Sequence, residues 1–115
     1  MPRKYIGDSM LYGLSKFMTK AGIDFVTATR AMRDDDDSSV AIPDGDLFRF
    51  VLEKKFRLVP REDAVDYTII TSDKELPAYC NAFGIDCILV EKPATRVAFK
   101  ETAAKLVERL KSVSS

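Results

Sequence analysis

Carboxylates are the side chains of this sequence that are best suited to chemistry. The chain contains no histidine, which excludes Ser-His-Asp and Cys-His catalysis and any histidine-ligated zinc or iron site. Its two cysteines, Cys80 and Cys87, lack C-x-x-C spacing and are too few for a disulfide framework, so we interpret both as reduced core residues. Acid–base chemistry must therefore come from carboxylates, lysine, tyrosine or metal-bound water.

Four aspartates stand where predicted strands end or a predicted helix begins. Asp8 and Asp73 each follow a strand-like run directly, and Asp44 and Asp46 stand at the start of a predicted helix. The carboxyl ends of parallel strands meet at one edge of a sheet, and ligands bind there in open α/β folds. We therefore expect three separate segments of the chain to bring carboxylates to one place.

A cluster of carboxylates is costly unless a cation neutralises it. Mg²⁺ or Mn²⁺ suits oxygen ligands, polarises phosphate and lowers the pKa of bound water, so the pattern predicts a divalent-metal site. The alternative for each acid is helix capping. Asp44 and Asp46 are good cap and first-turn residues, Asp8 can cap the helix that follows it, and Ser72 and Glu75 have capping-box spacing.

Hydrophobic periodicity predicts the elements that position these acids. Strand-like runs lie near residues 5–7, 25–29, 67–71 and 87–90, and helical patterns lie near 9–20, 46–55, 73–83 and from about 98. This order, β-α-β-loop-α-β-α-β-α, predicts an α/β fold: a single three-layer domain over residues 1–115 with a parallel central sheet and helices on both faces. The segment 30–44 is expected to be a solvated acidic loop, because Asp34–Asp37 repel one another, and 112–115 a frayed tail.

The net charge and the hydropathy of the sequence indicate which binding partners and which cellular compartment to expect. The 18 basic and 18 acidic residues give zero net charge. The chain is therefore not a strongly basic domain, which would have indicated nucleic-acid binding. A local basic stripe beside an acidic pocket would also give zero net charge and could still bind nucleic acid. The N-terminus lacks an apolar signal region, and no apolar run approaches membrane-spanning length. We expect a cytoplasmic protein with no membrane partner.

Several segments between residues 4 and 92 form one ordered pattern. They are Asp8-Ser9-Met10-Leu11 with Leu14, Lys16 and Gly22-Ile23-Asp24, then Asp44-Gly45-Asp46-Leu47, Ile69 to Leu76, and Gly84 to Val90. Together these segments resemble the Mut7-C type of PIN-like domain. The resemblance implies a PIN-like fold and an Mg²⁺- or Mn²⁺-dependent ribonuclease. By the same resemblance, Asp8, Asp46 and Asp73 are catalytic metal ligands, and Asp44 is a fourth ligand. Many members of the family are toxins paired with an antitoxin.

The sequence departs from the family pattern at two places. Ser72 precedes the last aspartate, where arginine is frequent, and the segment 30–43 is longer and more acidic than expected. Candidate phosphate contacts are Lys74, next to Asp73, and Lys16 and Arg30, which with Lys20 and Arg33 would form a positive rim. The alternative is that the lysines, Lys16 and Lys20, form the solvated face of the first helix.

Two functional hypotheses follow. The first is a metal-dependent ribonuclease, and the second is a non-catalytic PIN-like module for binding or assembly, which the neutral charge and the acidic loop favour. A receiver-like phosphoacceptor domain is a third possibility, but Asp8 lacks the adjacent second acid of that class. The partners expected are an RNA substrate, an antitoxin-like protein, and a second copy of the chain contacting apolar residues of the last helix.

Overall fold

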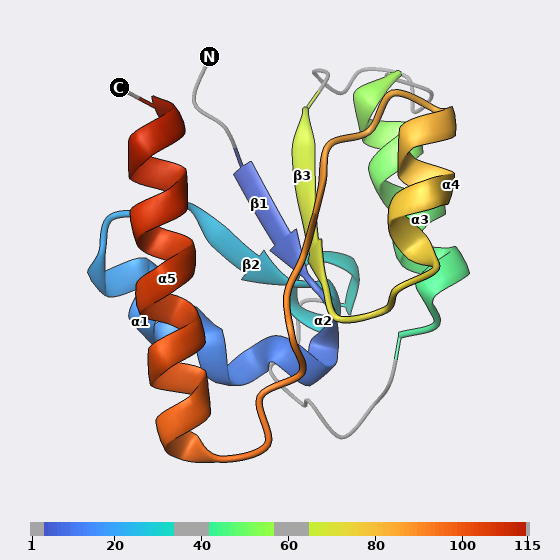
Figure 1. The fold of residues 1–115 in the computed structure, drawn as a ribbon. Coiled ribbons are helices and arrows are strands. Elements are labelled where there is room, and N and C mark those ends of the chain that lie inside the picture. Colours follow the sequence, from blue (N-terminus) through green and yellow to red (C-terminus); the bar gives the residue numbers. More distant parts are fainter. Residues whose placement is uncertain (1–3, 34–41, 57–64, 115) are drawn as a thin grey trace.

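The centre of the protein is a four-stranded sheet in which all strands are parallel. The computed structural model describes residues 4–33, 42–56 and 65–114. The sheet has the order β2-β1-β3-β4, and Figure 1 labels its first three strands, β2, β1 and β3. Its strands are β1 (Lys4–Gly7), β2 (Phe25–Thr27), β3 (Tyr67–Thr71) and β4 (Cys87–Leu89). The predicted α/β fold with a parallel central sheet is confirmed.

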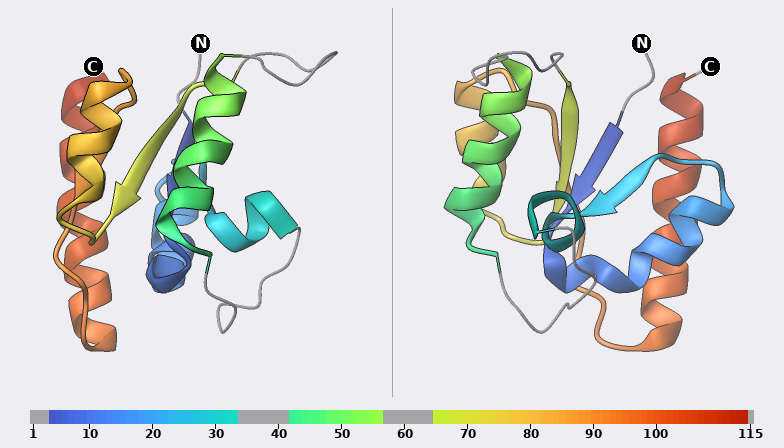
Figure 2. Two further views of the ribbon diagram at one scale, coloured as in Figure 1. Left: turned by 90° about the vertical axis from the view of Figure 1, so that its right-hand side faces the viewer. Right: turned by 180° about the vertical axis from the view of Figure 1, so that it is seen from behind.

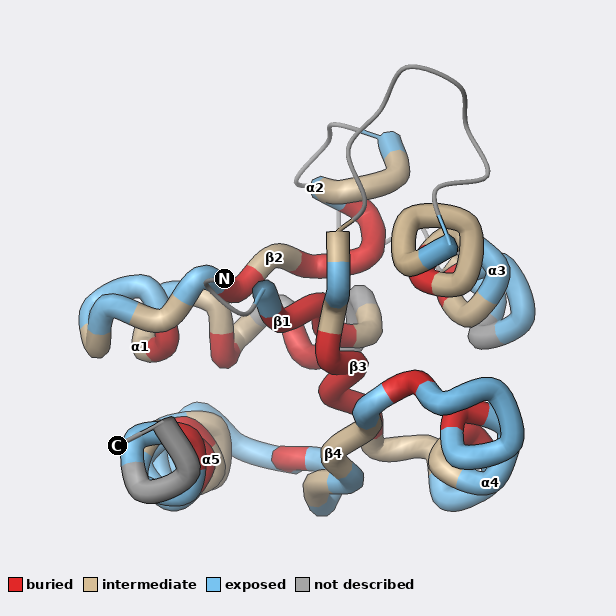
Figure 3. Tube along the Cα trace, turned by 90° about the horizontal axis from the view of Figure 1, so that it is seen from above, coloured by how far each residue is buried: buried red, intermediate tan, exposed pale blue. Residues whose placement is uncertain are grey.

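Helices cover both faces of this sheet. One face carries the 3₁₀ helix η1 (Ser9–Leu14), α1 (Ser15–Lys20) and α5 (Arg96–Ser114), and the other carries α2 (Ala28–Arg33), α3 (Asp44–Lys55) and α4 (Leu76–Ala82). Figure 2 shows α4, α3 and α2 side by side over one face, and Figure 3 shows α1 and α5 on the other side of the strands. The three-layer arrangement follows from the crossovers that parallel strands require.

The strands feed two separate cores because successive side chains point to opposite faces. Tyr5 and Ile70 belong to the core under η1, α1 and α5, whereas their neighbours Ile6 and Ile69 belong to the core under α2, α3 and α4. Both faces of β1 and β3 are thus buried, as expected for the central strands of a parallel sheet.

The second strand is shorter than the predicted run 25–29. It ends at Thr27, and Ala28 and Thr29 begin α2. The Thr27 hydroxyl oxygen accepts a hydrogen bond from the backbone N–H of Arg30 (3.3 Å), which is the geometry of an N-terminal helix cap. The predicted loop 30–44 was wrong at its start, because residues 30–33 belong to α2. The aspartate run 34–37 lies outside the described residues.

The first predicted helix, 9–20, has two parts. Its first half is the 3₁₀ helix η1, with a non-helical Leu11, and the α-helix α1 begins only at Ser15. Gly13 lies in η1 where a β-carbon would meet the Phe99 ring at 2.9 Å, so a glycine permits η1 to approach α5. Gly22 follows α1 with φ +78°, as expected for a left-handed cap.

The remaining helices differ from the predictions at their ends and on one face. The helix α3 begins at Asp44 rather than Asp46, and the last helix begins at Arg96 and continues to Ser114, through most of the expected tail. Tyr79 and Phe83 have helical spacing with Leu76 and Cys80, but they are 61% and 50% exposed. Leu76 and Cys80 are the buried residues of α4. No helix in the described ranges combines the length and the apolar character that crossing a bilayer requires.

Replacing Ile69 by alanine tests the core on the α3 side of the sheet. Ile69 is fully buried in the central strand β3, so Ile69→Ala should lower the free energy of unfolding by about 2–5 kcal/mol. Val97→Ala is the control, because Val97 is 65% exposed, and it should change stability by less than about 0.5 kcal/mol. Urea denaturation measures both, and equal effects would contradict the burial described here.

Candidate acidic site at the carboxyl edge of the sheet

The acidic site lies where the strand order reverses. The chain leaves β1 toward β2 on one side, and β3 lies on the other side of β1. The connections after β1 and β3 accordingly run over opposite faces, into η1 and into α4. Such a divergence leaves a crevice at the carboxyl ends of the two strands, where α/β proteins bind ligands.

Asp8 and Asp73 flank this crevice. Gly7 pairs with Ile70 in the sheet, and the backbone N–H of Asp8 donates a hydrogen bond to the Ile70 carbonyl (3.2 Å). Asp73 follows three residues after Ile70. Both aspartates are half-buried. The sheet thus brings two of the predicted acids to adjacent strand ends, as expected from their positions in the sequence.

The turn after β3 fixes the Asp73 side chain. The hydroxyl oxygen of the fully buried Thr71 accepts a hydrogen bond from the Asp73 N–H (3.0 Å), and Asp73 Oδ1 accepts one from the Glu75 N–H (2.9 Å). The predicted capping box of Ser72 and Glu75 does not fit this turn, because α4 begins at Leu76, directly after Glu75. Asp73 organises the turn instead.

The helix α3 begins beside Asp73, as expected. A cavity of about 340 Å³ is lined by Gly45 and Phe48 of α3, by Asp73 and Glu75, and by Leu76 and Tyr79 of α4. The carbonyl of Pro43 accepts hydrogen bonds from the N–H groups of Asp46 (3.0 Å) and Leu47 (3.1 Å), which starts the helix. Asp46 is exposed in the first turn, and the side chain of Asp44 lies outside the described part of the structure.

The acids meet the requirement for a divalent cation in part. Among the described side chains, no group of three or more acidic residues or cysteines is arranged to hold one ion. Two carboxylates at neighbouring strand ends still fit Mg²⁺, which proteins commonly hold with one or two carboxylates while substrate phosphates supply further oxygens. Among the described acids, Asp8 and Asp73 follow the neighbouring strands β1 and β3.

The basic residues predicted to contact phosphate are distributed over different parts of the molecule. Lys74 is exposed beside Asp73. Lys16 and Lys20 lie on α1 over one face of the sheet, whereas Arg30 and Arg33 lie on α2 over the other. The four cations of the predicted rim, Lys16, Lys20, Arg30 and Arg33, therefore lie over opposite faces of the sheet and do not form one rim. Lys16 and Lys20 instead share a cavity with Arg96, a residue that the sequence reasoning missed.

The cysteines take no part in the acidic site. Both are free; Cys80 is buried in α4, and Cys87 is half-buried in β4. Burial raises the pKa of the Cys80 thiol, and burial together with the neighbouring Cys80 raises the pKa of Cys87 to about 12. Both therefore remain protonated near neutral pH and are poor nucleophiles, in agreement with their interpretation as core residues.

Comparison of the chain with protein-family models, with curated proteins and with solved structures found no match. The likeness to PIN-like domains accordingly rests on the residues that carry it.

Removing the Thr71 hydroxyl tests how the Asp73 turn is held. Thr71→Val leaves the Asp73 N–H without its acceptor, so stability should fall by about 1 kcal/mol, and the Asp73 amide should exchange with solvent faster. Thr71→Ser keeps the hydroxyl and should preserve slow exchange at that amide. Amide hydrogen exchange followed by NMR measures this, and unchanged exchange in Thr71→Val would contradict the proposed anchoring.

Proposed function

We propose that the protein is a divalent-metal-dependent ribonuclease of the PIN-like kind, with its active site at the carboxyl ends of β1 and β3. The observation that supports this most is that Asp8 and Asp73 follow two paired strands, with the Asp8 N–H donating a hydrogen bond to the Ile70 carbonyl. The resemblance of residues 4 to 92 to the family agrees with it.

Each residue of the proposed active site would have its own role. Asp8 and Asp73 would hold Mg²⁺ or Mn²⁺, which would polarise the phosphodiester and activate water for its hydrolysis. Asp46 would add negative charge from the first turn of α3, whose Gly45 lines the same cavity as Asp73, and Asp44 would be a fourth ligand by the family resemblance. Lys74, which is exposed beside Asp73, would contact a phosphate oxygen. Thr71 orients Asp73 through its N–H.

A non-catalytic module for assembly is the second candidate function. It is favoured by two large exposed side chains, Tyr79 on α4 and Phe83 directly after it. Phe83 packs edge-on against Phe48 of α3 (ring centroids 5.3 Å apart). Exposed aromatic side chains of this kind are typical of surfaces that bind a protein. An antitoxin-like partner or a second copy of the chain would cover them.

Cleavage of labelled single-stranded RNA in Mn²⁺ or Mg²⁺ distinguishes the two functions. We expect metal-dependent cleavage that EDTA abolishes and that Asp8→Asn or Asp73→Asn lowers by about 100-fold or more, since even residues that only support metal ligands are worth 10–100-fold. Asp46→Asn should reduce the rate less, because its carboxylate is exposed on the first turn of α3.

Asp24→Asn is the matched control. Asp24 is exposed and precedes β2, at the opposite edge of the sheet, so this variant should cleave at the wild-type rate. If the folded wild type leaves several RNAs intact in both metals, the ribonuclease proposal fails and the assembly module takes its place.

A further inference from the structure

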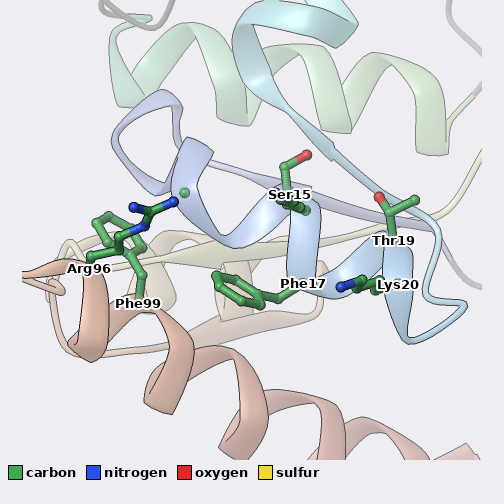
Figure 4. A pocket seen from close by; sticks show the side chains of 8 residues that line it. Ser15, Phe17, Thr19, Lys20, Arg96 and Phe99 are labelled. Atoms are coloured by element: carbon green, nitrogen blue, oxygen red, sulfur yellow. The ribbon is translucent and has the colours of Figure 1, made fainter.

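A second and larger cavity lies between α1 and the start of α5. Its volume is about 890 Å³, within the range of roughly 300–1,000 Å³ typical of ligand sites. Its lining comes from η1, α1 and α5: Gly13, Ser15, Lys16, Phe17, Thr19, Lys20, Arg96 and Phe99. Figure 4 shows Arg96 and Lys20 at opposite ends of the labelled side chains, with the Phe17 ring between them.

The described side chains that line this cavity carry positive charge. Lys16, Lys20 and Arg96 are the ionisable residues among them, and all three are exposed. The ion pairs Arg49–Glu53 and Lys55–Asp66 involve none of these three. A chain with zero net charge therefore gathers three cations around one hollow, with no carboxylate among the described lining residues.

The start of α5 adds to the positive potential. Backbone N–H groups at a helix N-terminus favour acidic neighbours and disfavour cations, yet the first turn of this 19-residue helix carries Arg96 and no acid. The Thr95 hydroxyl oxygen accepts a hydrogen bond from the Ala98 N–H (3.1 Å) and caps the helix. An anion bound in the cavity would relieve the unfavourable position of Arg96.

The apolar part of the lining is aromatic. Phe17 and Phe99 are half-buried, and both pack against the core under α1 and α5, so each presents part of a ring that the core holds in place. Cationic side chains that follow a phosphate backbone, together with aromatic rings on which bases stack, are the combination found in single-strand-binding grooves.

We propose that this cavity binds a segment of single-stranded RNA, with phosphates on Lys16, Lys20 and Arg96 and a base against Phe17 and Phe99. The choice of RNA rests on the proposed function, and the cavity would hold the substrate beyond the cleavage point. Gly13 of the lining belongs to η1, which begins directly after Asp8. A strand that leaves the acidic site along η1 therefore reaches the cavity.

Binding measured in EDTA tests this proposal separately from cleavage. Fluorescence anisotropy with a labelled single-stranded RNA would compare the wild type with the triple variant K16Q/K20Q/R96Q at several salt concentrations. We expect roughly tenfold weaker binding and a salt slope reduced by about 2, since each phosphate contact on a single strand contributes about 0.7 to the slope.

Lys111→Gln is the control for loss of charge, because Lys111 is exposed in the last turn of α5, and it should bind nearly as the wild type does. Asp8→Asn should retain binding in EDTA. If the wild type binds this RNA but leaves it intact in both Mn²⁺ and Mg²⁺, the ribonuclease proposal fails and the cavity proposal stands. Absence of binding by the wild type, or equal affinity of wild type and triple variant, would overturn the proposal. Equal affinity for a duplex of the same length would overturn the assignment to single strands.

Discussion

The pairing of β1 with β3 is the constraint on which the rest of the structure depends. These central strands bury Ile6 and Ile69 on one face and Tyr5 and Ile70 on the other. The next strand along the chain after β1 is β2, which pairs with β1 on the side opposite to β3. The connections between strands must therefore cover both faces of the sheet, and each face has its own core. The same pairing places Asp8 against the Ile70 carbonyl, so the fold and the proposed active site share one interaction.

The carboxyl edge of the sheet combines two regions of opposite charge. Asp8 and Asp73 lie at the crevice between β1 and β3, and the cavity with Lys16, Lys20 and Arg96 lies beyond η1. A polyanion is repelled by carboxylates alone, so an enzyme that holds a metal with acids needs cations elsewhere to bind its substrate. A net charge of zero is compatible with this division, because the two signs are separated in space.

The periodicity of the sequence was sufficient for the strands, the parallel sheet and the positions of Asp8 and Asp73, since those follow from which residues must be buried. It was insufficient where a single local contact decides. Thr27 has a β-branched side chain suited to a strand, yet its hydroxyl caps α2 and ends β2. Tyr79 and Phe83 have helical spacing with Leu76, but nothing in the sequence shows how wide a stripe of α4 is covered.

The basic cavity was equally difficult to predict. Lys16 and Arg96 are 80 residues apart in the sequence, and only the packing of α5 against η1, permitted by Gly13 next to Phe99, brings them together. The absence of acids from residues 92–100 was the available signal. A run without acids is usually a solvated helix face. Whether it contributes to a binding site depends on the elements that pack beside it.

The location of a bound metal tests the central claim most directly. Mn²⁺ added in small amounts to the ¹⁵N-labelled protein broadens the NMR signals of amides close to the ion. If Asp8 and Asp73 hold the cation, the amides of Gly7, Asp8, Ser72 and Asp73 should broaden first, and Asp8→Asn should abolish the effect. Broadening confined to other acidic segments, such as the run 34–37, with these four amides unaffected, would contradict the account.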